Sequence, residues 1–214
     1  MGDIFQEVDE DVRRDRLNKL WKDYGGYVVA GAVAIVLGTT ASVGWHEYTE
    51  QRKEADSDRF VAAIALANDG KPAEAAGAFE ALSGEAGEGY ALFARFRTAA
   101  ALKDSGDVEG AVQTFEAIAL DKDVDDLYRS LATLLAIMHM IDDGDPDALR
   151  AKLKPLLATD GAWRYSAREI SGALALRTGD RHLAKTEFQK LADDLLAPPS
   201  ARALATEILQ ILGN

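Results

Sequence analysis

Four segments of this chain repeat one pattern, and this periodicity constrains the fold more than any other feature. Each segment begins at a glycine, and Gly70, Gly106, Gly144 and Gly179 are separated by 36, 38 and 35 residues. A period in this range is typical of helical solenoids, in which each short repeat packs on the next. The spacing therefore predicts stacked helix–turn–helix units.

Apolar residues recur at fixed distances after each glycine. They stand five residues after it (Ala75, Ala111, Leu149, Ala184), nine residues after it (Phe79, Phe115, Leu153, Phe188) and twelve residues after it (Leu82, Ile118, Leu156, Leu191). Offsets of 5, 9 and 12 lie on one face of an α-helix. This face is expected to form the core of each unit.

The residues around each glycine predict a turn between two helices. Each glycine is expected to end a helix in the left-handed conformation. Asp107 and Asp180 follow two of the glycines and are expected to cap the next helix, while Pro72 and Pro146 suit a first helical turn.

The first helix of each pair is predicted in the stretch before the glycine. These stretches are 90–105, 127–143 and 163–178, and residues 59–68 would supply the first helix of the first repeat. Residues 45–68 read as helical and can continue directly from the segment before them. Residues 200–212 read as a terminal helix packed on the final repeat.

A second feature is an uncharged segment near the start of the chain. Residues 25–44 contain no charged side chain and are flanked by Tyr24 and Trp45. Twenty helical residues span about 30 Å, the thickness of the hydrocarbon core of a bilayer. We therefore predict a single transmembrane helix over 24–45. A signal peptide cleaved after Ser42-Val43-Gly44 and a buried helix of a soluble protein remain alternatives.

Basic residues near the ends of this segment predict its orientation. Five precede it (Arg13, Arg14, Arg16, Lys19, Lys22), and three follow within fifteen residues (Arg52, Lys53, Arg59). The excess favours a cytoplasmic N-terminus. In a bacterium the protein would then be a single-pass inner-membrane protein with a periplasmic C-terminal domain.

Small residues recur every four positions within the uncharged segment. They are Gly26, Ala30, Ala34, Gly38 and Ser42. Small side chains let two membrane helices approach closely, so these residues are candidates for a helix-packing face. The alternative is that small residues are simply frequent in this segment.

Charge and composition narrow the functional classes. Residues 46–214 hold 19 basic and 29 acidic side chains, and the whole chain has no cysteine. An acidic domain repels phosphate backbones, which argues against nucleic-acid binding. Without cysteine there is no disulfide framework, cysteine zinc site or thiol nucleophile.

No pattern in the chain predicts catalysis, a metal site or a cofactor. His46, His139 and His182 lack metal-ligand spacing. The acidic run 142–147 lacks the alternating ligands of a calcium loop and reads as a helix end, a turn and a cap. We therefore expect a non-enzymatic protein without a cofactor.

Binding is the remaining function, and the first helices are expected to line its surface. Stacked helix pairs curve and leave a concave face. Aromatic and arginine side chains are frequent anchors of interfaces. The candidates for a protein-binding groove are Arg95, Arg97, Tyr128, Arg129, Trp163, Arg164 and Arg168. The alternative is that the aromatic residues belong to the core and the arginines pair with acidic neighbours.

The repeats resemble the tetratricopeptide repeat at their glycine, small-residue and aromatic positions, as in Gly106, Ala111 and Phe115. The fold class is thus predicted as all-α, with an N-terminal single transmembrane helix followed by a tetratricopeptide-like α-solenoid. The predicted organisation is a cytoplasmic amphipathic segment (1–23), the transmembrane helix (24–45), a juxtamembrane helix leading into the first repeat (46–69) and the repeat domain (70–214).

The order of segments in the whole chain resembles a narrower family, the YfgM-type membrane-anchored tetratricopeptide proteins. The resemblance rests on the charged start from Phe5 to Gly25, one span rich in small residues, the juncture from Trp45 to Tyr48, and the degenerate repeats. It implies an accessory of the SecYEG translocon in the bacterial inner membrane. It also implies a membrane-anchored periplasmic chaperone of the prolyl-isomerase-like type as a partner. The alternative function is a scaffold for another envelope assembly. A third possibility, a soluble cytoplasmic adaptor, requires that the prediction of a membrane span is wrong.

Overall fold

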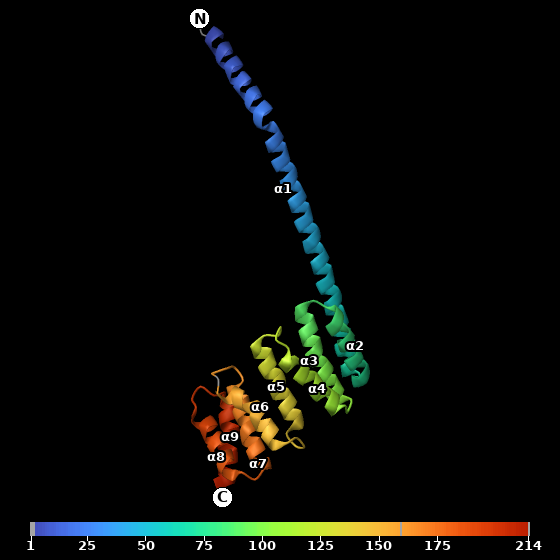
Figure 1. Ribbon diagram of the computed structural model, residues 1–214, viewed down its shortest axis with the longest axis vertical. Helices are drawn as coiled ribbons and strands as arrows, with labels where there is room; N and C mark the ends of the chain where they lie inside the picture. Colours follow the sequence, from blue (N-terminus) through green and yellow to red (C-terminus); the bar gives the residue numbers. More distant parts are fainter. Residues whose placement is uncertain (1–2, 159, 214) are drawn as a thin grey trace. The chain divides into compact units, whose positions relative to one another are not determined.

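The computed structural model describes residues 3–158 and 160–213, and these residues form an all-α fold (Figure 1). The helices are α1 (Asp3–Asn68), α2 (Pro72–Glu85), α3 (Glu88–Asp104), α4 (Val108–Leu120), α5 (Asp126–Met140), α6 (Pro146–Ala158), α7 (Arg164–Arg177), α8 (Arg181–Asp193) and α9 (Pro199–Gly213). The described residues contain no strand. The predicted fold class, an apolar N-terminal helix followed by helical repeats, is confirmed.

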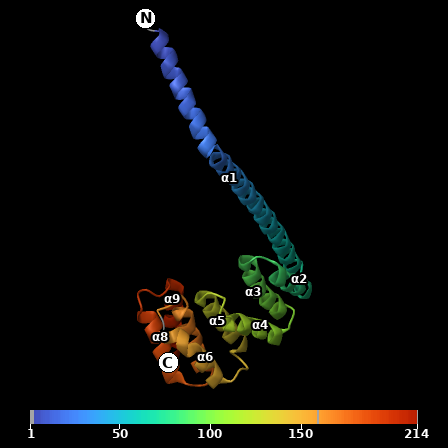
Figure 2. The ribbon, with the colours of Figure 1, turned by 45° about the horizontal axis from the view of Figure 1, so that its top comes forward.

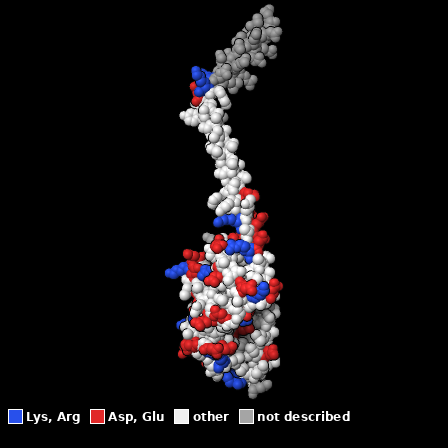
Figure 3. Space-filling view, turned by 90° about the vertical axis from the view of Figure 1, so that its right-hand side faces the viewer, with Lys and Arg blue, Asp and Glu red and all other residues white. Residues whose placement is uncertain are grey.

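The chain divides into two compact units, Met1–Ala55 and Asp56–Asn214, and the division falls within α1. The first unit contains the uncharged segment, and Figure 3 shows a stretch of α1 without basic or acidic side chains. Two threonine hydroxyls in this stretch donate back to the helix, Thr39 to the Ile35 carbonyl and Thr40 to the Val36 carbonyl. Both threonine hydroxyls therefore have a hydrogen-bond acceptor within the helix and do not need water as an acceptor.

The second unit is a succession of helix pairs. The end of α1 pairs with α2, and the pairs α3–α4, α5–α6 and α7–α8 follow, with α9 packed on α8 (Figure 2). In the first pair, Ala63 of α1 is buried in one cluster with Phe79 and Leu82 of α2. The ring centroids of Phe60 and Phe79 lie 5.3 Å apart, edge to face. The last residues of α1 thus serve as the first helix of the first repeat.

The positions five, nine and twelve residues after each glycine form the core, as the sequence predicts. Buried side chains occupy eleven of these twelve positions (Ala75, Phe79, Leu82, Ala111, Phe115, Ile118, Leu149, Leu153, Ala184, Phe188, Leu191). The twelfth, Leu156, is half-buried against the cluster that contains Leu149 and Leu153. Each second helix therefore packs through the same face.

The turns between paired helices follow the prediction at three of the four glycines. Gly70, Gly106 and Gly179 have φ values of 74°, 94° and 75°, in the left-handed region that glycine adopts without steric cost. The carboxylate of Asp107 accepts from the Gly110 backbone N–H at 2.9 Å. Asp180 accepts from the Leu183 N–H at 2.9 Å. Both aspartates are N-caps, as predicted.

At Gly144 the prediction of a left-handed glycine is wrong, because this glycine has no positive φ. The α5–α6 connection is longer than the other turns, and the Gly144 N–H donates to the Met140 carbonyl at 2.8 Å. A Cβ added at Gly144 would lie 2.7 Å from that carbonyl oxygen. Glycine is required there by a close approach of backbone rather than by φ. Asp145 caps α6 by accepting from the Ala148 N–H.

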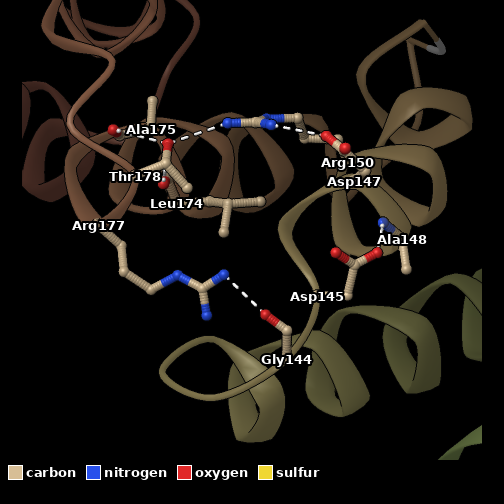
Figure 4. A network of polar contacts seen from close by, with 9 residues as sticks. All are labelled: Gly144, Asp145, Asp147, Ala148, Arg150, Leu174, Ala175, Arg177 and Thr178. Atoms are coloured by element: carbon tan, nitrogen blue, oxygen red, sulfur yellow. Dashed lines mark hydrogen bonds and ion pairs between the residues drawn. The ribbon is translucent and has the colours of Figure 1, made fainter.

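Polar contacts join successive repeats at intervals of one repeat length. The Trp163 indole N–H donates to the Leu127 carbonyl at 2.8 Å, and Arg177 donates to the carbonyls of Ile141 at 2.6 Å and Gly144 at 2.7 Å. Figure 4 shows the Arg177 guanidinium reaching from the end of α7 to the α5–α6 connection. Arg177 therefore satisfies carbonyls that the longer connection leaves outside any helix.

Candidate functional site

Among the described residues, one helix is long and apolar enough to cross a membrane, and it is α1. The most apolar part of this helix is not buried by the rest of the chain. The large side chains of Tyr27, Ile35 and Leu37 are more than 60% exposed. The length and apolar composition of α1 are those that a helix needs to cross a membrane.

The five small residues predicted as a helix-packing face, Gly26, Ala30, Ala34, Gly38 and Ser42, are exposed along α1. A Cβ added at Gly26 or Gly38 would contact nothing within 4 Å. Because residues four apart on an α-helix are offset by about 40°, the row winds around the helix. Only three or four consecutive members can face one straight partner helix. The row remains a prediction.

The seven residues predicted to line a groove have different surroundings, and most have partners within the fold. Arg95 forms an ion pair with Asp121 at 2.7 Å, and this hydrogen bond is the main cause of the lowered pKa of Asp121. Arg129 pairs with Asp126 at 3.0 Å. The guanidinium of Arg164 lies over the ring of Tyr165, 4.4 Å from its centroid.

The two predicted aromatic anchors also have structural contacts. Tyr128 packs edge to face on Phe93, with ring centroids 5.9 Å apart. Trp163 packs against the cluster of Leu134, Ile137 and their neighbours, besides its hydrogen bond to the Leu127 carbonyl. Arg168 makes no ion pair or side-chain hydrogen bond with the described residues and is half-buried.

Arg97, one of the seven, lines a cavity, and this cavity is the most apolar hollow described on the repeat unit. It has a volume of about 540 Å³. It lies between the first helices of three successive repeats, α1, α3 and α5, with one ring from α4. Its lining residues are Phe60, Tyr90, Phe93, Phe96, Arg97, Ala100, Lys103, Asp104, Phe115, Leu135 and His139. We refer to it as the aromatic cavity.

The walls of the aromatic cavity are held by ring contacts between helices. Phe60 of α1 lies 5.8 Å from Tyr90 of α3, measured between ring centroids. Phe96 of α3 lies 6.0 Å from Phe115 of α4. Aromatic pairs at these separations add stability beyond the area they bury. The cavity is therefore built from side chains that pack on one another and still leave space between them.

His139 forms part of the cavity lining as a neutral ring. It stacks on Phe115 with centroids 5.7 Å apart and an interplanar angle of 12°. Burial lowers the pKa of His139, and the positive charge of Lys103 lowers it further, while Asp104 opposes this shift. At neutral pH the imidazole is thus an aromatic surface rather than a cation.

Sequence reasoning missed most of this cavity because it treated the first-helix aromatics as isolated anchors. A signal was present in α3, where Tyr90, Phe93, Arg97, Ala100 and Asp104 follow the spacing of one helical face. The contributions of α1, α4 and α5 depend on how the repeats pack. They cannot be found from spacing within one helix.

Comparison with known proteins agrees with this architecture. Neither curated proteins nor solved structures give a significant match to the chain. A protein-family profile described as a tetratricopeptide repeat-like domain matches residues 18–211, which cover the end of the predicted cytoplasmic segment, the apolar span and all the repeats. This match extends over most of the 214 residues. The chain therefore belongs to the tetratricopeptide repeat-like domain family.

Proposed function

We propose that this protein is a membrane-tethered protein-binding module that serves the Sec translocon and the periplasmic chaperone network. Tetratricopeptide-like domains typically act as non-enzymatic modules for protein–protein interaction. The observation that carries the proposal is the short distance along the chain between anchor and module. The uncharged segment ends at Gly44, and the repeat unit begins at Asp56.

A short connection of this kind concentrates the module at the membrane surface. Linked binding sites reach effective concentrations of about 1 mM when the linker is short. A partner in the same membrane is then bound even when its affinity for the isolated repeats is low. This favours partners that are themselves membrane proteins.

The proposed topology places residues 1–23 in the cytoplasm and the repeats, 70–214, in the periplasm, with 24–45 in the bilayer and 46–69 as the juxtamembrane helix. Its support is the excess of basic residues before the uncharged segment. The C-terminal unit is acidic and is not expected to adhere to anionic lipids, so the helix supplies the membrane attachment. Carbonate-washed membranes should retain the protein, and protease added to spheroplasts should digest its C-terminal unit.

The proposed partners are SecYEG and a prolyl-isomerase-like chaperone of the periplasm, and the support for both is the resemblance in segment order. Crosslinking in intact membranes followed by mass spectrometry tests this directly. Crosslinks to the translocon or to the chaperone support the proposal. Crosslinks confined to another envelope assembly would replace it with the alternative function, a scaffold for that assembly.

The row of small residues in α1 is proposed as the contact with a partner helix in the membrane. Gly38→Leu adds bulk to the row without lowering apolarity, so insertion should persist while copurification of the partner falls. Val36→Leu, outside the row, is the matched control and should change neither. Equal copurification by both variants would show that the helix is only a tether.

A further inference from the structure

We infer that Arg52 of α1 binds the phosphate group of a membrane phospholipid, in the leaflet that lies next to Trp45. This inference rests on the proposed membrane anchor and adds a lipid contact to it. The contact fixes the depth of α1 in the bilayer. Three properties of α1 support it, namely the partners of its basic residues, the aromatic rings beside Arg52 and the height of the Arg52 guanidinium above the uncharged segment.

Arg52 differs from the two basic residues that follow it in α1 because it has no acidic partner. Lys53 pairs with Glu50 at 2.7 Å, and Arg59 pairs with Glu85 at 2.9 Å. Arg52 is exposed, and it forms no ion pair or side-chain hydrogen bond with any residue that the structure describes. Its charge is therefore available to an anion outside the chain.

Two aromatic rings beside Arg52 suit the surface of a bilayer. Trp45 and Tyr48 are 71% and 51% exposed, and their ring centroids lie 6.3 Å apart. The Cζ atom of Arg52 lies over the Tyr48 ring, 5.3 Å from its centroid. Exposed Trp and Tyr side chains favour the boundary between hydrocarbon and headgroups, because each has an apolar body and a polar group. Spacings of three and four residues place Trp45, Tyr48 and Arg52 on one side of α1, which we call the juxtamembrane face.

The height of the guanidinium matches the headgroup layer. The uncharged segment ends at Gly44, and Tyr48 lies four residues further, a rise of about 6 Å. A bilayer of about 40–45 Å has a hydrocarbon core of about 30 Å, which leaves about 5–7 Å for each headgroup layer. Arg52 is one turn beyond Tyr48, but its side chain reaches back to the Tyr48 ring. The guanidinium is thus at the level of the lipid phosphates.

Nearby carboxylates leave this position open to a phosphate. Glu47, Glu50 and Glu54 are rotated around the helix by about 140–160° from Arg52, so they lie on the opposite side. Asp56 is on the same side, but its carboxylate accepts from a backbone N–H of the α2–α3 connection at 3.1 Å. The donors of a guanidinium lie at the edge of its plane, and two of them can bind one phosphate together.

The first test measures the distance between arginine and lipid phosphorus. The full-length protein is placed in liposomes of phosphatidylcholine, in a buffer without inorganic phosphate, so that all phosphorus belongs to lipid. Solid-state NMR then detects the dipolar coupling between lipid phosphorus and arginine labelled isotopically at Cζ. Arg52→Gln should remove the coupled signal of one arginine. Arg59→Gln is the matched control and should leave the coupled signal unchanged, because Arg59 binds Glu85.

The second test measures the depth of α1 with a spin label. The chain has no cysteine, so Gly44→Cys supplies a single labelling site, and an added Cβ there meets nothing within 4 Å. Arg52→Glu places a negative charge beside the phosphates, which should drive the juxtamembrane face outward. The accessibility of the label to a water-soluble nickel complex should rise at least twofold. Lys53→Glu, with the same change of charge outside the juxtamembrane face, should have a smaller effect.

Unfolding of the repeats does not explain these results, because Arg52 makes no described ion pair within the chain. An unchanged coupled signal in Arg52→Gln would overturn the inference. It is also overturned if Arg59→Gln loses as much coupled signal, or if Lys53→Glu changes the accessibility of the label as much as Arg52→Glu. Protein that carbonate extracts from the liposomes would refute the membrane anchor itself. Protein that stays in the membrane without coupling at Arg52 would refute only the lipid contact.

Discussion

A close contact between α7 and α8 gives the sharpest test of the repeat packing. Gly172 lies inside α7, and a Cβ added there would be 2.7 Å from Cζ and 2.8 Å from Cε2 of Phe188. The Phe188 ring is 1% exposed and packs in one cluster with Ala184, Leu191 and Ala205. Gly172→Ala should therefore force a buried ring to move in a region with little free space.

Two opposing effects set the size of the change in stability. Alanine in a helix interior is favoured over glycine by about 1 kcal/mol. The ring must retreat by about 0.7 Å to restore ordinary contact, and overpacking of this kind costs about 1–3 kcal/mol. Gly172→Ala should lower the free energy of unfolding by up to about 2 kcal/mol.

A matched substitution in α2 isolates the steric effect. Gly77 lies inside α2 and is exposed, and a Cβ there would meet nothing within 4 Å. Gly77→Ala should raise the stability by up to about 1 kcal/mol. Because the helix preference is common to both variants, the difference between them measures the overlap with Phe188.

Urea denaturation followed by far-ultraviolet circular dichroism provides the measurement. The midpoints should move in opposite directions for Gly77→Ala and Gly172→Ala. In a Phe188→Leu background the smaller side chain leaves room, so the penalty of Gly172→Ala should fall by at least half. Equal stabilisation by the two alanine variants would refute the packing of α7 against α8 described above.

Three further predictions address the core, the connection between repeats and the pH dependence. Phe115→Ala removes a side chain that is 2% exposed and should lower the unfolding free energy by about 3–5 kcal/mol; an unchanged melting temperature would contradict the repeat register. Arg177→Met removes the charged donors that bind the Ile141 and Gly144 carbonyls, and it should lower the free energy of unfolding, measured by urea denaturation, by about 2 kcal/mol. A decrease below about 0.5 kcal/mol would show that water replaces these donors. Folding lowers the pKa of His139 from its ordinary value of 6.5, so the unfolded chain binds more protons and the stability should fall as the pH drops below about 6.5. In His139→Gln the urea midpoint should therefore change less between pH 7.5 and 5.5 than in the unaltered protein. Identical pH profiles for the two proteins would disprove this contribution.

The sequence by itself determined the repeat register and the turns at Gly70, Gly106 and Gly179. The spacing of apolar residues assigns one face to each second helix, and the structure buries that face at Phe79, Phe115, Leu153 and Phe188. This prediction succeeds because helical periodicity is a local property of the chain. The N-cap at Asp107 was likewise readable, since a cap and the N–H that it accepts are three residues apart.

The uncharged segment could also be recognised from the sequence alone, because the length and composition of a helix decide whether it can cross a bilayer. Orientation and the identity of partners do not follow from such a segment alone. They depend on groups outside the helix, and they stay predictions for the experiments above.

The roles of the arginines and aromatics were decided only by tertiary structure. Arg95 and Arg97 lie two positions apart in α3, yet Arg95 forms an ion pair with Asp121 at the end of α4, whereas Arg97 lines a cavity and forms no ion pair with the residues that the structure describes. Which carboxylate comes within reach depends on residues from other helices, as with Asp121 and Arg95 across 26 positions. A periodic pattern specifies which face of a helix is buried, but not which side chain of a neighbouring helix meets it.

Gly144 and the aromatic cavity show the same limit. The sequence places Gly144 in a turn like the other three, but the close approach of the Met140 carbonyl, with Arg177 bound from the next repeat, decides its conformation. The cavity exists because rings from α1, α3, α4 and α5 meet without filling the space between them. Packing of side chains from distant segments creates the cavity, and the Arg177 contact at Gly144 comes from the next repeat, so the spacing of residues within one helix specifies neither.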